Sequence, residues 1–254
     1  MGPGLEISKT SGTVALPGTP ETPGALRPGG GLRFQRGLHH GLGEMKNSLP
    51  GGRARKLVYL PIIHTAADMG TLGASIRGMK LSTLGRQGLK QNAAVVDKMW
   101  EELERVVSNL PVPPGTVRVY QDGLPVSGHE QEIVSELAAA GHRNHGLLLK
   151  LQARGATLMG TESPELLVEE YQLATAAFAC GASARTEVRQ KQLRDTLLEK
   201  RDRYIGDRIN RTLGAGESGI LFMGMLHQVT RYLDPDIAVV YPLGPPRARQ
   251  GRGV

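Results

Sequence analysis

The sequence predicts an α/β fold: a single domain with a mostly parallel central sheet flanked by helices. Short apolar runs, typical of strands, alternate along the chain with longer segments of helical periodicity. The apolar runs lack the strict alternation of a half-exposed antiparallel strand, so helices are expected to cover both faces of the sheet. Both ends of the chain are poor in large apolar side chains, which limits the domain to the middle.

Five apolar runs are expected to form the strands, namely residues 57–63, 116–121, 156–161, 218–224 and 237–243. Five helical patterns lie between them: residues 93–110, 129–139 and 143–154, a helix that begins near Ser163, and a long helix over 185–213. Ser163 is a suitable N-cap because Pro164 and early acidic residues follow it. The order of the strands in the sheet does not follow from these patterns.

Composition divides the chain into one domain, residues 56–243, and two basic tails. Residues 1–55 hold 13 of the 34 glycines and six of the 16 prolines, and residues 244–254 are similar in kind. Both tails are therefore expected to be disordered. The tails also carry the whole net charge of +7, which leaves residues 56–243 neutral. A neutral domain argues against specific binding of nucleic acid.

The surroundings of the protein can be inferred from what the sequence lacks. It holds one cysteine, Cys180, which excludes an intrachain disulfide and is expected to pack as a core thiol. No apolar run is long enough to span a bilayer, and the N-terminus lacks the apolar stretch of a signal peptide. We therefore expect a cytoplasmic protein without a membrane partner, and the sequence does not indicate an oligomeric state.

Four polar residues come directly after predicted strands: His64, Asp122, Glu162 and His227. The carboxyl ends of parallel strands meet at one edge of a sheet, so these side chains are expected to lie together. Two imidazoles and two carboxylates suit metal binding or acid–base chemistry. Each residue also has a purely structural explanation, such as the Asp-Gly turn that begins at Asp122 or the helix N-terminus that follows Glu162.

An arginine interrupts the apolar stripe of the last long helix. The stripe has i, i+4 spacing and consists of Leu193, Leu197, Ile205 and Ile209, with Arg201 in its middle. A guanidinium on the buried face of a helix needs a partner. We expect that partner to be Glu162, Asp122 or an anionic group of a substrate, and a purely structural ion pair is an equal alternative.

Four short motifs resemble the TraB/GumN/Tiki-like superfamily, whose wider relatives include ChaN-like and erythromycin-esterase-like proteins. They are 61-PIIH-64, 160-GTESPE-165, 200-KRDRYIGDRI-209 and 224-GMLH-227. The family pattern has Gly-x-x-His at the first and last motif and Arg-Asn in the helix, so Pro61 and Asp202 are departures from it. The resemblance implies a pocket of two histidines, a glutamate and an arginine. Members include a metal-dependent protease, hydrolases of cyclic esters and proteins without known activity.

Together these features predict a hydrolase that cuts a peptide, amide or ester bond of a small-molecule or peptide substrate. His64, Glu162 and His227 would bind a divalent metal such as Mn, Co or Zn, which would activate water. Without a metal, a His–Glu pair would act as the general base. Arg201 would stabilise the oxyanion or orient a carboxylate, and Asp122 would be a further ligand or orienter. The alternative is a protein that binds or senses a small ligand or anion in the same crevice without turnover.

Overall fold

The structure is a computed structural model, and it describes residues 54–63, 73–179 and 184–245. These residues belong to the unit Leu49–Val254, whereas a second unit, Met1–Ser48, lies outside the described residues. His64 and Cys180 also lie outside them, as does most of both predicted tails.

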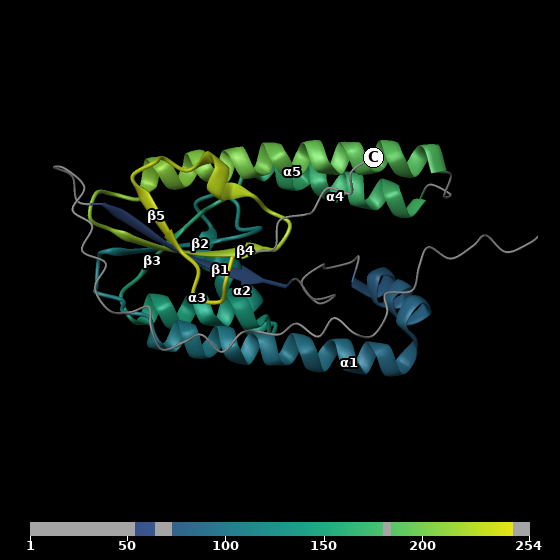
Figure 1. The fold of residues 1–254 in the computed structure, drawn as a ribbon, viewed down its shortest axis with the longest axis horizontal. Helices are drawn as coiled ribbons and strands as arrows, with labels where there is room; N and C mark the ends of the chain where they lie inside the picture. The colour runs from purple at the N-terminus through teal and green to yellow at the C-terminus, as the bar shows by residue number, and fades with distance from the viewer. Residues whose placement is uncertain (1–53, 64–72, 180–183, 246–254) are drawn as a thin grey trace, which may run out of the picture. The chain divides into compact units, whose positions relative to one another are not determined.

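The described residues form a five-stranded sheet with helices on both faces (Figure 1). The strands are β1 (Arg55–Ile62), β2 (Val117–Gln121), β3 (Thr157–Met159), β4 (Ser218–Gly224) and β5 (Ile237–Val240). The helices are α1 (Gly73–Asn109), α2 (Glu130–Ala139), α3 (Arg143–Ala153), α4 (Pro164–Ala179), α5 (Ala184–Thr212) and the short 3-10 helix η2 (Val229–Tyr232). The predicted α/β class is thus confirmed.

All strand pairs in the sheet are parallel, and the strand order is β3-β2-β4-β1-β5. The central strand β4 pairs with β1 on one side and with β2 on the other. Because all strands run the same way, the segments that leave β2, β3 and β4 emerge at the same edge of the sheet. This edge is where the candidate site lies.

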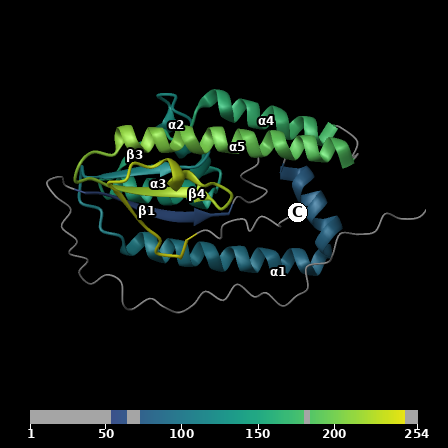
Figure 2. The same ribbon diagram turned by 45° about the horizontal axis from the view of Figure 1, so that its top comes forward.

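Each face of the sheet has its own apolar core. On one face, β1, β2 and β4 pack against α1, α2 and α3 through residues such as Trp100, Val134 and Leu148. On the other face, the same strands pack against α5 and η2 through Ile205, Ile209 and Val229. Figures 1 and 2 both show α4 lying alongside α5, and α5 is the element against which α4 packs most closely.

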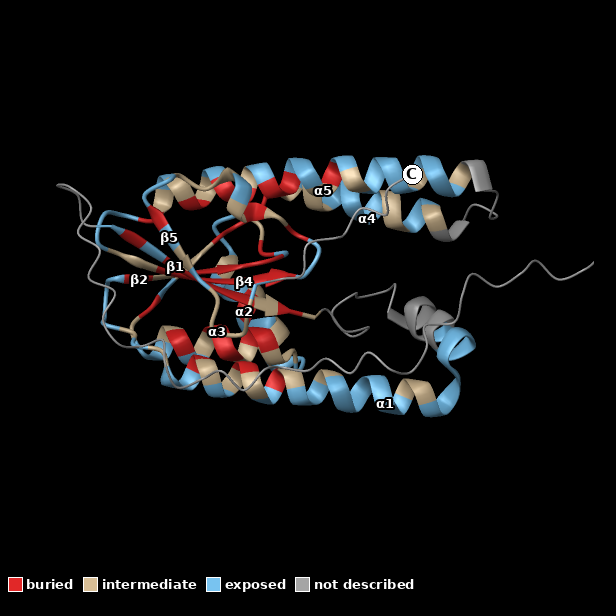
Figure 3. Cartoon of the chain, in the orientation of Figure 1, coloured by how far each residue is buried: buried red, intermediate tan, exposed pale blue. Residues whose placement is uncertain are grey.

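Helix α1 is longer than predicted, since it begins at Gly73 and not at residue 93. Its first part carries no apolar stripe that periodicity could reveal, and residues 81–92 are mostly exposed (Figure 3). Gly85 has φ 67° and ψ 175°, a conformation that favours glycine, and it divides the helix at a kink. Of residues 81–109, for which the side chains are described, those from about Val96 onward pack against the sheet.

Two further expectations are corrected at the residue level. Leu193, predicted to be on the buried stripe of α5, is 47 % exposed. One end of α5 extends past the sheet (Figure 1), so not all of the predicted stripe can pack against it. Strand β1 begins at Arg55, within the predicted tail, because its guanidinium pairs with Asp234 and Asp236 next to β5. No helix within the described ranges is long and apolar enough to cross a membrane.

Candidate functional site

Three neighbouring strands are each followed by a buried ionisable side chain at the shared edge of the sheet. Asp122 follows β2, Glu162 lies three residues after β3, and His227 lies three residues after β4. Helix α5 brings Arg201 to the same place from above the sheet. The structure therefore brings together four of the five predicted site residues, and the fifth, His64, lies outside the described residues.

The backbone around Glu162 is fixed by the loop that follows β2. The amides of Thr161 and Glu162 both donate to the Leu124 carbonyl, and the Val126 amide donates to the Glu162 carbonyl. Ser163 then caps α4, as predicted, by accepting a hydrogen bond from the Leu166 amide at 3.2 Å. Glu162 is thus held between a strand and a helix start, with no exposed surface.

Arg201 binds Glu162 through a two-pronged ion pair. Its Nε donates to Oε2 and its Nη2 donates to Oε1, both at 2.6 Å. The Gly123 amide donates to the same Oε1 at 2.7 Å, which Gly123 achieves with a positive φ of 78°. Nη1 of Arg201 also contacts the half-exposed Glu170 of α4 at 2.5 Å. The predicted need of Arg201 for a carboxylate partner is confirmed.

Asp122 links this ion pair to the histidine. Its Oδ1 accepts a hydrogen bond from Arg201 Nη2 at 3.0 Å, and its Oδ2 accepts one from the Gly224 amide at 2.9 Å. The same Oδ2 lies 3.5 Å from His227 Nε2. Asp122 therefore stands between the two cationic side chains of the site.

Asp202 is a site residue that the sequence patterns do not single out. Its Oδ1 lies 2.5 Å from His227 Nδ1, and its Oδ2 accepts the Gln228 amide at 2.8 Å. The carboxylate thus fixes both the ring of His227 and the backbone beside it. A carboxylate on Nδ1 leaves Nε2 as the ring atom that points toward Asp122. The one signal for it in the sequence is the helix motif, where Asp202 replaces the family asparagine next to Arg201.

Glu162, Arg201, Asp122, His227 and Asp202 form one charged network, and their charges determine which of these side chains are protonated. Burial by itself lowers the pKa of His227, but Asp122 and Asp202 outweigh burial and raise the pKa to about 10, so the ring is cationic at pH 7. Burial raises the pKa of the Glu162 carboxyl above its ordinary value, and Arg201 opposes that rise. Burial also disfavours the Arg201 cation, yet its carboxylate partners raise the pKa of the guanidinium.

The described residues do not fit the predicted metal. Within the described ranges, no group of three or more His, Cys, Asp or Glu has an arrangement that could hold a metal ion. Both oxygens of Glu162 are bound to Arg201, whose positive charge would repel a divalent cation there. Nδ1 of His227 is bound to Asp202. A metal held with the help of His64 stays a prediction.

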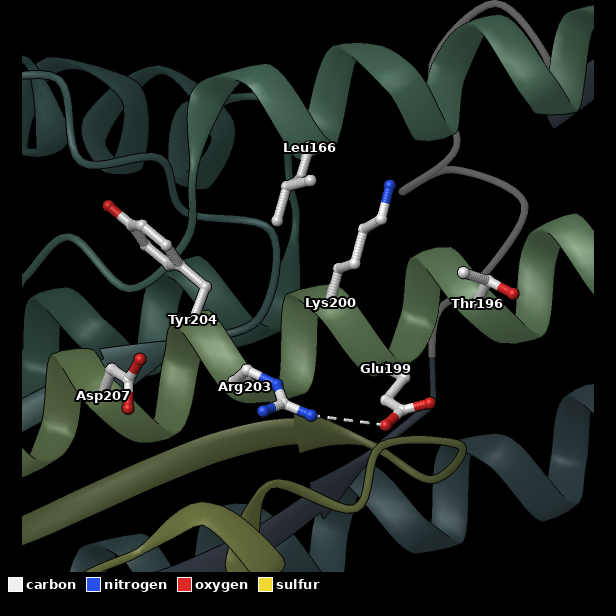
Figure 4. Close-up of a pocket in the computed structure, with 7 residues that line it drawn as sticks. All are labelled: Leu166, Thr196, Glu199, Lys200, Arg203, Tyr204 and Asp207. Atoms are coloured by element: carbon white, nitrogen blue, oxygen red, sulfur yellow. Dashed lines mark ion pairs between the residues drawn. The ribbon is translucent and has the colours of Figure 1, made fainter.

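A hollow of about 470 Å³ lies between α4 and α5, and Figure 4 shows its lining. The lining residues are Leu166, Thr196, Glu199, Lys200, Arg203, Tyr204 and Asp207. Its two acids and two bases balance one another, and one such pair, Arg203 with Glu199, is 3.5 Å apart. None of the network residues lines this hollow, so we place the candidate site at the sheet edge and not here.

The network combines an oriented cationic imidazole, a carboxylate beside it and a buried guanidinium at the edge where parallel sheets form their sites. Such a set can donate a proton from Nε2, accept one at Asp122 and stabilise negative charge. Comparison with known proteins adds no further assignment: no family model, no curated protein and no solved structure matches the chain.

Proposed function

We propose that the protein is a hydrolase of ester or amide bonds that acts at Asp122 and His227. The observation that carries this proposal is the line Asp202–His227–Asp122, in which one carboxylate holds the imidazole and a second lies 3.5 Å from its other nitrogen. A carboxylate–imidazole pair is the usual way to orient a catalytic histidine. The resemblance to a superfamily that contains hydrolases supports the same class of reaction.

In the proposed reaction Asp122 accepts a proton and His227 donates one. Water attacks the carbonyl carbon and gives one proton to Asp122, while the cationic His227 gives its Nε2 proton to the leaving oxygen or nitrogen. The carbon–leaving-group bond then breaks. Transfer of the proton from Asp122 to His227 restores the site, so one water is consumed in each turnover.

Arg201 and Glu162 act around this pair. Arg201 contacts Asp122 at 3.0 Å, which fixes the carboxylate in position and lowers the cost of charge in a buried place. Glu162 holds Arg201 in turn through both oxygens. In this proposal Arg201 stabilises the negative charge that forms on the carbonyl oxygen, and Glu162 is a positioning residue.

A second candidate function is the binding of a small ligand without turnover. It is favoured by one observation: the charged groups of the network are already paired with one another inside the protein, since Arg201 is bound by Glu162 and Asp122, and His227 by Asp202. A closed network of this kind can shape a pocket without supplying a free base at pH 7.

Turnover of esters and amides separates the two candidates. The purified protein is assayed with p-nitrophenyl esters and short peptide amides, alongside His227→Gln and the control His129→Gln, whose side chain is 75 % exposed. We expect turnover by the wild type, a loss on the order of 100-fold or more in His227→Gln and no loss in the control. Thermal shifts by ligands that are never hydrolysed would instead support the binding protein.

The metal prediction has its own measurement. The desalted protein is analysed for Mn, Co and Zn, and the esterase assay is repeated after treatment with a chelator. A stoichiometric metal whose removal abolishes turnover would establish metal assistance. Full activity in protein that holds less than a tenth of an equivalent of metal would contradict it.

A further inference from the structure

Tyr59 of β1 has a buried hydroxyl group that the charged network does not use. The residue is 1 % exposed, and within the described part of the chain its Oη makes no hydrogen bond. By contrast Tyr120, equally buried, has its hydroxyl 2.9 Å from Thr212 Oγ1. A buried hydroxyl without a partner destabilises a protein, so its presence needs an explanation.

The sheet register places Tyr59 near the candidate site. Tyr59 pairs with Leu221 of β4, which pairs with Tyr120 of β2, so all three lie in one row and on the face covered by α5. Asp122 is two residues beyond Tyr120 and therefore lies on the same face in the next row. Ile205 of α5 packs in the same cluster, one turn from Asp202.

The chemistry of Tyr59 makes it a hydrogen-bond donor at this place. Burial raises the pKa of the phenol well above its ordinary value, and the charges of Asp122 and Asp202 raise it further. The hydroxyl is therefore protonated at neutral pH. The same two carboxylates disfavour an anionic group beside it, so the acceptor that suits this position is a neutral oxygen.

We propose that the Tyr59 hydroxyl donates a hydrogen bond to the carbonyl oxygen of a bound ester or amide. This inference rests on the proposed function, because a substrate carbonyl is what that function brings to the sheet edge. Tyr59 would thereby add a neutral donor to the cationic His227 and Arg201.

The stability of Tyr59→Phe tests whether the hydroxyl has a structural role. Urea unfolding is compared for the wild type, Tyr59→Phe and the matched variant Tyr120→Phe, which loses the contact with Thr212. We expect Tyr59→Phe to unfold at the same or a higher urea concentration than the wild type, and Tyr120→Phe at a lower one. A loss in Tyr59→Phe as large as that in Tyr120→Phe would overturn the proposal.

Binding of N-methylacetamide, a neutral amide probe, tests the ligand role directly. Its dissociation constant is measured by NMR titration for the wild type and for Tyr59→Phe. We expect about tenfold weaker binding in the variant, the effect of one lost hydrogen bond. Equal binding by both proteins, or no binding by the wild type, would overturn the proposal. If binding weakens as expected while the wild type hydrolyses no ester or amide, Tyr59 is a ligand contact and the hydrolase proposal fails by itself.

Discussion

Arg201 connects the buried carboxylates of the site. Because its own side chain is buried, its charge must stay paired. The guanidinium binds Glu162 through two nitrogens and also reaches Asp122, with a side chain that is only 5 % exposed. Removing one partner from such a cluster leaves a buried charge without compensation, which costs far more than the loss of an exposed ion pair.

Arg201→Met should lower the free energy of unfolding by about 3–5 kcal/mol, because Glu162 and Asp122 lose their shared counter-ion. The control is Arg203→Met, on the same helix. That side chain is 63 % exposed and pairs with Glu199 at 3.5 Å, so the expected loss is about 1 kcal/mol or less. Urea unfolding monitored by circular dichroism measures both. Equal losses in the two variants would show that the buried network does not stabilise the fold.

His227 should make stability depend on pH in a defined direction. Its pKa is about 10 in the folded protein, above the ordinary 6.5, so the folded state binds the proton more tightly. The resulting stabilisation is fully present below about pH 6.5 and is lost as the pH rises toward 10. The difference in unfolding free energy between the wild type and His227→Gln should therefore shrink from pH 6 to pH 10.

Urea unfolding of the two proteins at pH 6, 7, 8, 9 and 10 measures this difference. All other ionisable groups are present in both proteins, so their contribution to the difference largely cancels. A difference that stays constant or grows over this range would contradict a raised pKa of His227.

At the scale of elements, α5 is the part of the fold that assembles the site. One face of it carries Leu197, Ile205 and Ile209 into the core, and Arg201 and Asp202 stand at the sheet edge on that face. Gly206 lies against η2, the short helix that follows His227. A Cβ atom at Gly206 would lie 2.6 Å from the Tyr232 Cβ. The spacing between α5 and the His227 segment thus depends on this glycine.

Gly206→Ala should destabilise the protein by about 1–3 kcal/mol, because the added methyl group forces α5 away from η2. The matched control is Gly146→Ala in α3, where an added Cβ meets no atom within 4 Å. There the better helix propensity of alanine should stabilise the protein by up to about 1 kcal/mol. Thermal or urea unfolding compares the two. A Gly206→Ala variant as stable as the wild type would show that the contact has room to relax.

The sequence is most informative about strands and where they end. β4 has the predicted bounds, residues 218–224, because its apolar run has clear polar or glycine limits on both sides. The start of α1 escapes prediction because residues 73–92 have no apolar stripe and contain several glycines, which are uncommon in helices. Periodicity detects only the helical face that packs against something.

The site is predictable to the extent that it depends on strand ends and on one odd residue in a stripe. Asp122, Glu162, His227 and Arg201 are identified in this way, and the structure brings them together. Asp202 escapes prediction because its contact with His227 joins positions 25 residues apart, with the end of α5 and all of β4 between them, and no local pattern encodes such a contact. The unpaired hydroxyl of Tyr59 cannot be predicted from the sequence either, because a tyrosine is common in the apolar run of a strand.

At the scale of the whole molecule, the apolar side chains that stabilise the sheet and the polar side chains of the candidate site lie in different places. The two apolar cores occupy the faces, and the buried polar residues of the network are displaced to one edge. Residues 56–243 carry no net charge, so attraction of polyanions to this part of the chain is not expected. The edge network is therefore the feature around which a function of the described residues can be built.

The rate of ester and amide hydrolysis by the purified protein, measured for the wild type and for His227→Gln in parallel, tests the hydrolase proposal most directly. We predict measurable turnover of at least one substrate, lowered on the order of 100-fold or more in a His227→Gln variant that still unfolds cooperatively. Turnover that is unchanged in this folded variant, or absent from the wild type across both substrate classes, would contradict it.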